Sequence, residues 1–218
     1  MGEAAILTPL RFEKMSGTKP WAVALMAGGK STRMGQDKAR LVDGAGRELW
    51  QGRLDLLREL GAGEVMISCR EDQRYLAGSG ARLVFDRWKE AGPLGGIVSC
   101  LEAMEAPRLL VLGVDLPGVT RKMLECLLEA AAGGIPRGIP GGAVFRRDGF
   151  LEPLVAVYPG GMAVSGRRRL EAGEFSLHGW IGEAGEVMRV LPLPAEWAGA
   201  LINVNDPAGW AAWRAGGG

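Results

Sequence analysis

The chain has 218 residues, of which 47% are hydrophobic and 23% are charged, and its formal net charge is +1. This composition excludes a disordered, highly charged chain, and the small net charge provides no bulk attraction to nucleic acid. No apolar run approaches the roughly 20 residues that span a bilayer, so we expect no contact with a membrane. Short apolar runs alternate with helical stripes along the chain. Strands are predicted at 21–26, 65–68, 82–85 and 109–114, and helices at 49–60, 94–104 and 123–131.

The second half of the chain is less regular. Strands are predicted at 143–145 and 154–158 and a terminal helix at 208–214, while the glycines and prolines of 133–142 indicate a loop. Apolar strands that alternate with helices are typical of a sheet covered on both faces. The sequence therefore predicts an α/β fold, a three-layer αβα arrangement around a mostly parallel, twisted sheet.

Cysteine and histidine are rare. The chain has three cysteines and one histidine, and it contains no C-x-x-C pair. A zinc site needs more ligands at closer spacing, and this pattern does not suit a disulfide-stapled secreted domain, so we expect a cytoplasmic location. Residues 1–20 do not resemble a signal peptide. We expect a flexible N-terminal extension over 1–20, one domain over 21–214 and a frayed tail over 215–218.

The strongest local signal follows the first predicted strand. The segment reads Leu25-Met-Ala-Gly-Gly-Lys-Ser-Thr-Arg-Met-Gly-Gln-Asp-Lys38. Glycines let main-chain N–H groups converge on an anion, and Lys30, Arg33 and Lys38 add positive charge, which suits a triphosphate. A Walker A loop would need glycine at Ala24, and a dinucleotide fingerprint would need glycine at Lys30. The alternative interpretation is an ordinary glycine-rich strand–helix connection with surface lysines.

Residues 26–39 resemble the signature L-A-G-G-x-S-x-R-M-G-x-D-K of nucleotidyltransferases, most closely that of the molybdenum cofactor guanylyltransferases, which join GMP to molybdopterin. Four further blocks follow in the family order: Gly92-Pro-Leu-Gly-Gly-Ile97, Asp115-Leu-Pro117, Glu152-Pro-Leu-Val-Ala-Val-Tyr158 and Asn203-Val-Asn-Asp-Pro207. The resemblance covers 21–213. It implies a Rossmann-like nucleotidyltransferase fold, Mg²⁺ as cofactor, and GTP and Mo-molybdopterin as substrates.

The resemblance also assigns residues. It implies that Lys38, Arg33 and Asp115 are catalytic and that Asp115 binds the metal. Asn203 and Asn205 fall where relatives bind the acceptor. The nucleotide-binding residues it implies are Met26, Ala27, Gly28, Gly29, Lys38, Ser68, Asp86 and Asp115.

Several of these residues have a structural alternative. Asp115 could cap the helix that follows it, and Asp86 could be a turn residue. The run of arginines over 167–169 is interpreted as a solvated face, and His178, the only histidine, as structural or solvent-facing. A base is not required, because an acceptor phosphomonoester, with a second pKa of about 6, is already largely dianionic at neutral pH.

The leading hypothesis is a guanylyltransferase that acts on molybdenum-bound molybdopterin. The alternatives are a molybdopterin cytidylyltransferase, a sugar-phosphate nucleotidyltransferase, and a non-catalytic nucleotide-binding protein. The resemblance further implies transient contact with proteins that deliver molybdopterin or mature molybdoenzymes. We expect neither nucleic acid nor a membrane among the partners.

Overall fold

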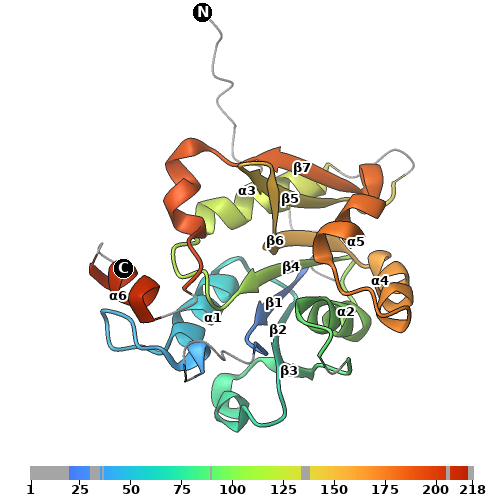
Figure 1. Cartoon of the computed structure of the whole chain (residues 1–218). Helices are drawn as coiled ribbons and strands as arrows, with labels where there is room; N and C mark the ends of the chain where they lie inside the picture. The colour runs from blue at the N-terminus through green and yellow to red at the C-terminus, as the bar shows by residue number, and fades with distance from the viewer. Residues whose placement is uncertain are drawn as a thin grey trace, which may run out of the picture.

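A seven-stranded sheet in the order β3-β2-β1-β4-β6-β5-β7 organises the chain (Figure 1). The computed structural model describes residues 20–29, 35, 37–88, 90–133, 138–204 and 207–215. The strands are β1 Ala22–Met26, β2 Glu64–Cys69, β3 Arg82–Phe85, β4 Arg108–Gly113, β5 Gly142–Arg147, β6 Phe150–Pro159 and β7 Met188–Pro192. The α-helices are α1 Leu49–Glu59, α2 Pro93–Ala103, α3 Arg121–Ala132, α4 Met162–Glu171, α5 Leu177–Glu183 and α6 Pro207–Ala215.

One strand reverses the direction of the sheet. Strands β3, β2, β1 and β4 pair in parallel, β6 is antiparallel to both β4 and β5, and β7 is parallel to β5. The prediction of a mostly parallel sheet is therefore confirmed.

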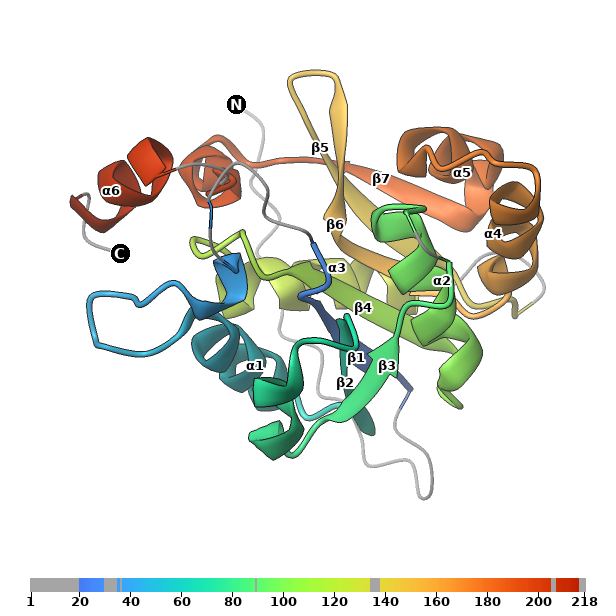
Figure 2. The ribbon, with the colours of Figure 1, turned by 60° about the horizontal axis from the view of Figure 1, so that its bottom comes forward.

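Helices cover both faces of the sheet (Figures 1 and 2). Leu25 and Leu112 are buried against α1 and α3, whereas their neighbours Ala24 and Val111 are buried against α2, α4 and α5. Side chains of a strand alternate between its faces, so strands buried on both sides must be apolar throughout. The predicted three-layer arrangement is confirmed.

The entry to α2 shows how the sequence fixes a local boundary near the site. Gly92 has a φ of 62°, a left-handed conformation that favours glycine, and Pro93 begins the helix. Proline is well suited to this first position because its missing N–H would have no partner within the helix. The Gly92-Pro93 pair thus sets the point at which α2 begins.

Three elements between β6 and the C-terminal region, α4, α5 and β7, were missing from the sequence prediction. In α4 only Met162, Gly166 and Leu170 are buried, and β7 is an edge strand on which Arg189 is exposed. Such elements bury little apolar surface, so their hydrophobic period is weak. Within the described ranges, no helix has the length and apolar character that crossing a membrane requires.

The predicted extension and tail cannot be compared with the structure, because 1–19 and 216–218 lie outside the described residues. The expected loop over 133–142 is described only at 133 and from 138 onward, and β5 begins at its last residue. The domain organisation stays a prediction.

Candidate functional site

The strand order reverses between β1 and β4, and such a switch point is where open α/β sheets bind ligands. Hydrogen bonds hold the three strand ends together there. The Val114 N–H donates to the Met26 carbonyl at 3.1 Å, and the Ala27 N–H donates to the Ser68 carbonyl at 2.9 Å. The segments that leave β1, β2 and β4 therefore begin side by side at the carboxyl edge of the sheet.

Two of the predicted catalytic residues meet at this edge. The Lys38 Nζ lies 3.6 Å from the Asp115 Oδ2, and the two side chains are 17% and 19% exposed. Lys38 opens the 3-10 helix η1 (Lys38–Arg40), whose first turn is capped by Asp37, because the Ala39 N–H donates to the Asp37 Oδ1 at 3.1 Å. The pair combines a fixed cation with a carboxylate that solvent can reach.

The structure excludes the capping alternative for Asp115. Helix α3 begins at Arg121, and its N-cap residue is Thr120. Asp115 lies instead in the turn directly after β4, where the Leu116 N–H donates to the Gly113 carbonyl at 3.3 Å. Its carboxylate is therefore not committed to a helix N-terminus.

The predicted glycines provide hydrogen-bond donors. Neither the Gly28 N–H nor the Gly29 N–H donates to another residue in the described part of the chain. The Ala27 N–H, by contrast, is already engaged with the Ser68 carbonyl. Two adjacent amides with no partner among the described residues suit phosphate oxygens. Arg33, which the resemblance places in the same loop, lies outside the described residues.

On the β2–β3 side, the predicted nucleotide-binding residues Ser68 and Asp86 pack against the start of α2. Ser68 is only 2% exposed. A Cβ added to Gly96 would lie 2.5 Å from the Ser68 Oγ, and one added to Gly95 would lie 2.7 Å from the Asp86 Oδ1. The two glycines therefore allow α2 to approach the side chains of the site.

The electrostatics of Asp86 are set by partial burial. Burial raises its pKa above the ordinary value, while the Trp88 N–H, which donates to the Asp86 Oδ1 at 2.8 Å, opposes the shift. A half-buried carboxylate accepts hydrogen bonds and, when ionised, offers none, so Asp86 can select a ligand that presents donors. The hydrogen bond from Trp88 also fits the alternative role of Asp86 as a turn residue.

On the opposite side of Asp115, a cleft of about 560 Å³ opens between four segments. It is lined by Leu116, Arg147, Asp148, Phe150, Leu151, Glu152, Pro153, Leu154, His178 and Asn203. Asn203 is held beside Asp115 through its neighbour, because the Val204 N–H donates to the Asp115 carbonyl at 3.0 Å. The predicted acceptor residue Asn203 thus lies where a second substrate can approach, whereas Asn205 lies outside the described residues.

Charged groups line this cleft. The Arg147 Nη2 lies 3.0 Å from the Glu152 Oε1, and Arg147 also donates to the Leu201 carbonyl at 2.9 Å. Burial raises the pKa of Glu152, and the nearby Arg147 and His178 lower it in part. His178 is exposed, as expected, but it lines the cleft rather than an unrelated surface. The predicted solvated face over 167–169 is confirmed for Arg167 and Arg168, which are exposed, but it is wrong for Arg169, whose side chain is only 12% exposed.

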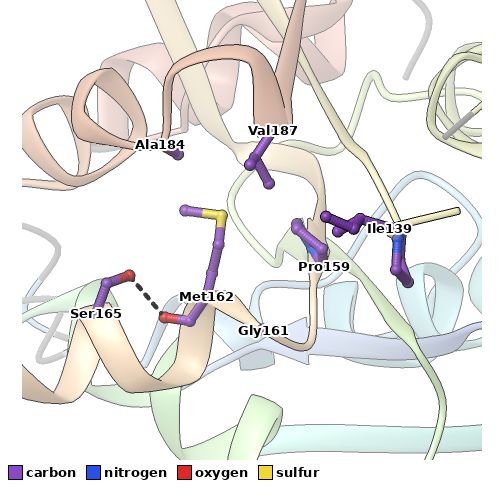
Figure 3. Close-up of a pocket in the computed structure, with 8 residues that line it drawn as sticks. Ile139, Pro159, Gly161, Met162, Ser165, Ala184 and Val187 are labelled. Atoms are coloured by element: carbon purple, nitrogen blue, oxygen red, sulfur yellow. Dashed lines mark hydrogen bonds between the residues drawn. The ribbon is translucent and has the colours of Figure 1, made fainter. Parts of the chain in front are cut away.

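A smaller cavity of about 320 Å³ lies at the opposite edge of the sheet (Figure 3). Pro159, which lines it, pairs with the first residue of β4, so this cavity is separated from Asp115 by the length of that strand. Ile139, Met162 and Val187 make its wall largely apolar, and the Ser165 hydroxyl already donates to the Met162 carbonyl at 3.0 Å. Among the described residues, none that lines this cavity carries a charge that could bind a nucleotide.

Comparisons with known proteins identify the family and the fold of the chain. A profile of the MobA-like NTP transferase domain matches residues 23–184. A probable molybdenum cofactor guanylyltransferase of Opitutus terrae is 37% identical over 191 residues, covering 85% of this chain and 91% of that protein. A molybdenum cofactor guanylyltransferase of Pseudomonas aeruginosa is 33% identical over 200 residues, covering 88% and 93%. The crystal structure of molybdopterin-guanine dinucleotide biosynthesis protein A from Archaeoglobus fulgidus has the same fold, with a TM-score of 0.71 at 20% identity, covering 89% of this chain and 97% of that one.

Proposed function

The chain belongs to the MobA-like NTP transferase family, and from this premise we propose that it transfers GMP from GTP to the phosphate of Mo-molybdopterin. The products are molybdopterin guanine dinucleotide and pyrophosphate. The observation that carries the proposal is the Lys38–Asp115 pair at the switch point, where the segment that leaves β1 also carries the Gly28 and Gly29 amides. The names of the relatives support the choice of GTP and molybdopterin.

In this reaction an oxygen of the acceptor phosphate forms a bond to the α-phosphorus of GTP. The bond from that phosphorus to the bridging oxygen of the β-phosphate breaks, and pyrophosphate leaves with the electron pair. Lys38 and the two amides would stabilise the negative charge that builds up on the phosphate oxygens. The acceptor is already dianionic near neutral pH, because the second pKa of a phosphomonoester is about 6, so the chain needs no base.

The residues of the site fit Mg²⁺ better than a metal whose ligands all come from the protein. Within the described ranges, no group of three or more His, Cys, Asp or Glu side chains could hold an ion. Mg²⁺ commonly binds to one or two carboxylates together with substrate phosphates and water. Asp115 is the residue that would hold it, and the bound ion would supply positive charge to the triphosphate and the departing pyrophosphate.

The base is proposed to be guanine because of Asp86. The Watson–Crick edge of guanine offers N–H donors at two adjacent positions, which a carboxylate can accept together. The corresponding edge of cytosine offers one donor group, so a carboxylate is a poorer match. This is the feature that favours the guanylyl reaction over a cytidylyl reaction at the same site.

The acceptor is proposed to occupy the cleft on the other side of Asp115. Arg147 brings a positive charge to a substrate that is itself an anion, His178 adds an imidazole, and Asn203 adds an amide. We place the reaction in the cytoplasm because Cys69, Cys100 and Cys126 are all free thiols. Proteins that deliver molybdopterin or receive the product are the transient partners that this reaction would need.

The test is a substrate screen. The protein is incubated with Mg²⁺, Mo-loaded molybdopterin and each nucleoside triphosphate in turn, and pyrophosphate release is followed with and without acceptor. We expect release with GTP only, and only when the acceptor is present. Release with CTP alone would replace the guanylyl by the cytidylyl reaction. No release with any triphosphate would refute transfer to molybdopterin.

A further inference from the structure

The segment that follows β2 contacts the glycine-rich loop from outside the predicted site. The Arg70 Nη1 donates to the Gly28 carbonyl at 3.2 Å and to the Gly29 carbonyl at 2.6 Å. The Gln73 Nε2 donates to the Ala27 carbonyl at 2.9 Å. Three successive carbonyls at the start of the loop are thus held by two side chains.

The same segment also holds the far end of the loop. The Asp37 Oδ2 accepts from the Tyr75 hydroxyl and from the Gln73 Nε2, each at 2.8 Å, and it lies 3.5 Å from the Arg70 Nη2. Asp37 is the residue that caps η1, which begins with Lys38. We call Arg70, Gln73 and Tyr75 the loop clamp, because they connect the glycines at one end of the loop with the lysine at the other.

Because peptide groups are planar, the contacts with the carbonyls also fix the directions of the Gly28 and Gly29 N–H groups. In a trans peptide, the C=O of one residue and the N–H of the next point in opposite directions. Holding the Ala27 carbonyl therefore turns the Gly28 N–H away from the clamp, and holding the Gly28 carbonyl does the same for the Gly29 N–H. Glycine backbone is otherwise free to adopt many conformations, so this orientation needs an external constraint.

We propose that the loop clamp positions the Gly28 and Gly29 amides and Lys38 for the phosphates of the nucleotide. The clamp acts through the loop, so its members are positioning residues that need not touch the substrate. This inference rests on the proposed function, because it takes a nucleoside triphosphate as the ligand. It adds to that function a reason why Gly28, Gly29 and Lys38 hold their positions before the ligand binds.

A substitution of Gln73 tests the positioning role of the loop clamp without changing the charge of the site. It is neutral and only 2% exposed, so it cannot attract phosphate over a distance. Arg70 is cationic and its side chain is 27% exposed, so its charge could contribute directly. A lysine at position 70 keeps the charge but lacks the planar fork that reaches two carbonyls and a carboxylate at once.

The experiment compares GTP with guanosine, which has the same base and no phosphate. Dissociation constants are measured in the presence of Mg²⁺ for wild type, Arg70→Lys and Gln73→Met, with guanosine measured by displacement of GTP. The matched control is Arg74→Lys, an exposed arginine at the start of η2 (Arg74–Ser79). We expect both clamp variants to weaken GTP binding by about tenfold, the size of one lost charge-assisted hydrogen bond, and to leave guanosine binding and the control unchanged.

Other outcomes overturn the inference. If GTP and guanosine weaken equally, the clamp supports the whole site and does not position the phosphate-binding amides. If Arg70→Lys and Gln73→Met both bind GTP like wild type, the clamp has no role in binding. Tyr75→Phe removes one hydroxyl, so it tests the Asp37 end of the clamp in a variant that is expected to fold. Failure of the proposed function would look different, because the wild-type protein itself would bind no GTP.

Discussion

Replacing Asp115 by asparagine separates the role of its charge from that of its shape. The substitution removes one negative charge from a site that receives a polyanion. Without Mg²⁺, we therefore expect GTP to bind the variant more tightly than it binds wild type. With Mg²⁺ we expect turnover to fall by about 100- to 1,000-fold, the usual range for losing one group that stabilises transition-state charge.

The geometry sets the size of these effects. At the observed 3.6 Å, a unit charge pair such as Lys38–Asp115 is worth about 4–5 kcal/mol for an effective dielectric constant of about 20. Both side chains are nearly one-fifth exposed, so solvent reduces the net contribution toward the roughly 0–1 kcal/mol of ion pairs that water reaches. The variant should therefore fold. Repulsion between the carboxylate and a metal-free triphosphate is screened in the same way, so its removal should tighten binding by up to about fivefold.

The assay measures GTP dissociation constants with and without Mg²⁺, together with kcat at saturating substrates. Asp55→Asn is the matched control, because Asp55 is 53% exposed on α1 and pairs only with Arg47 and Arg58 among the described residues. Its kinetics should equal those of wild type. If Asp115→Asn retained wild-type turnover, or if Mg²⁺ strengthened GTP binding equally in both proteins, Asp115 would not be the metal ligand.

Three further predictions address the remaining parts of the site. His178→Ala should raise KM for the acceptor and leave KM for GTP unchanged, because the exposed imidazole lines the cleft proposed for the acceptor; an equal rise in both KM values would show that His178 does not act on the acceptor alone. Gly118→Ala should lower the free energy of unfolding, measured in urea, by about 1–3 kcal/mol. The new Cβ would lie 2.8 Å from the Ala200 carbonyl oxygen, and relieving this clash requires the backbone to move. Unchanged stability would show that the two segments can move apart at little cost. Asp86→Asn should weaken selection of GTP over CTP and also change how stability depends on pH. Burial raises the pKa of Asp86 above 3.8, so the folded state binds this proton more tightly than the unfolded state does. The contribution of Asp86 to the free energy of unfolding therefore falls as the pH rises from 3.8 through the raised pKa of the folded state. Urea unfolding at several pH values should show this fall in wild type and a smaller one in the variant.

The sequence predicted those parts of the fold that are buried on both sides. The strand predicted at 109–114 is observed at Arg108–Gly113, and the helix predicted at 123–131 is observed at Arg121–Ala132. These segments contain apolar residues at every core position, so their period is clear. Helix α4 and strand β7 carry much of their surface in solvent, and tertiary contacts with the sheet decide their structure.

The sequence likewise predicts some residues of the candidate site and not others. Lys38 and Asp115 belong to recognisable blocks, and the topology brings them together at one edge. The loop clamp could not be predicted, because Gln73 and Tyr75 have side chains that occur in many contexts and their partner Asp37 is far away in the sequence. Only the parallel pairing of β1 with β2 shows that the segment after β2 must lie beside the loop after β1.

The direction of strand β6 gives the carboxyl edge of the sheet room for both of the proposed substrates. Leu112 near the end of β4 pairs with Val155, so the residues that precede Val155 in β6 extend beyond the carboxyl edge of β4. Glu152 and Pro153 therefore line the acceptor cleft next to Leu116. A parallel strand in that position would have carried its first residues to the opposite edge, where Pro159 lines the apolar cavity. The direction of β6 thus supplies the second wall of the cleft, which accounts for the place of the Glu152-Pro-Leu block among the family motifs although it carries no cation for phosphate.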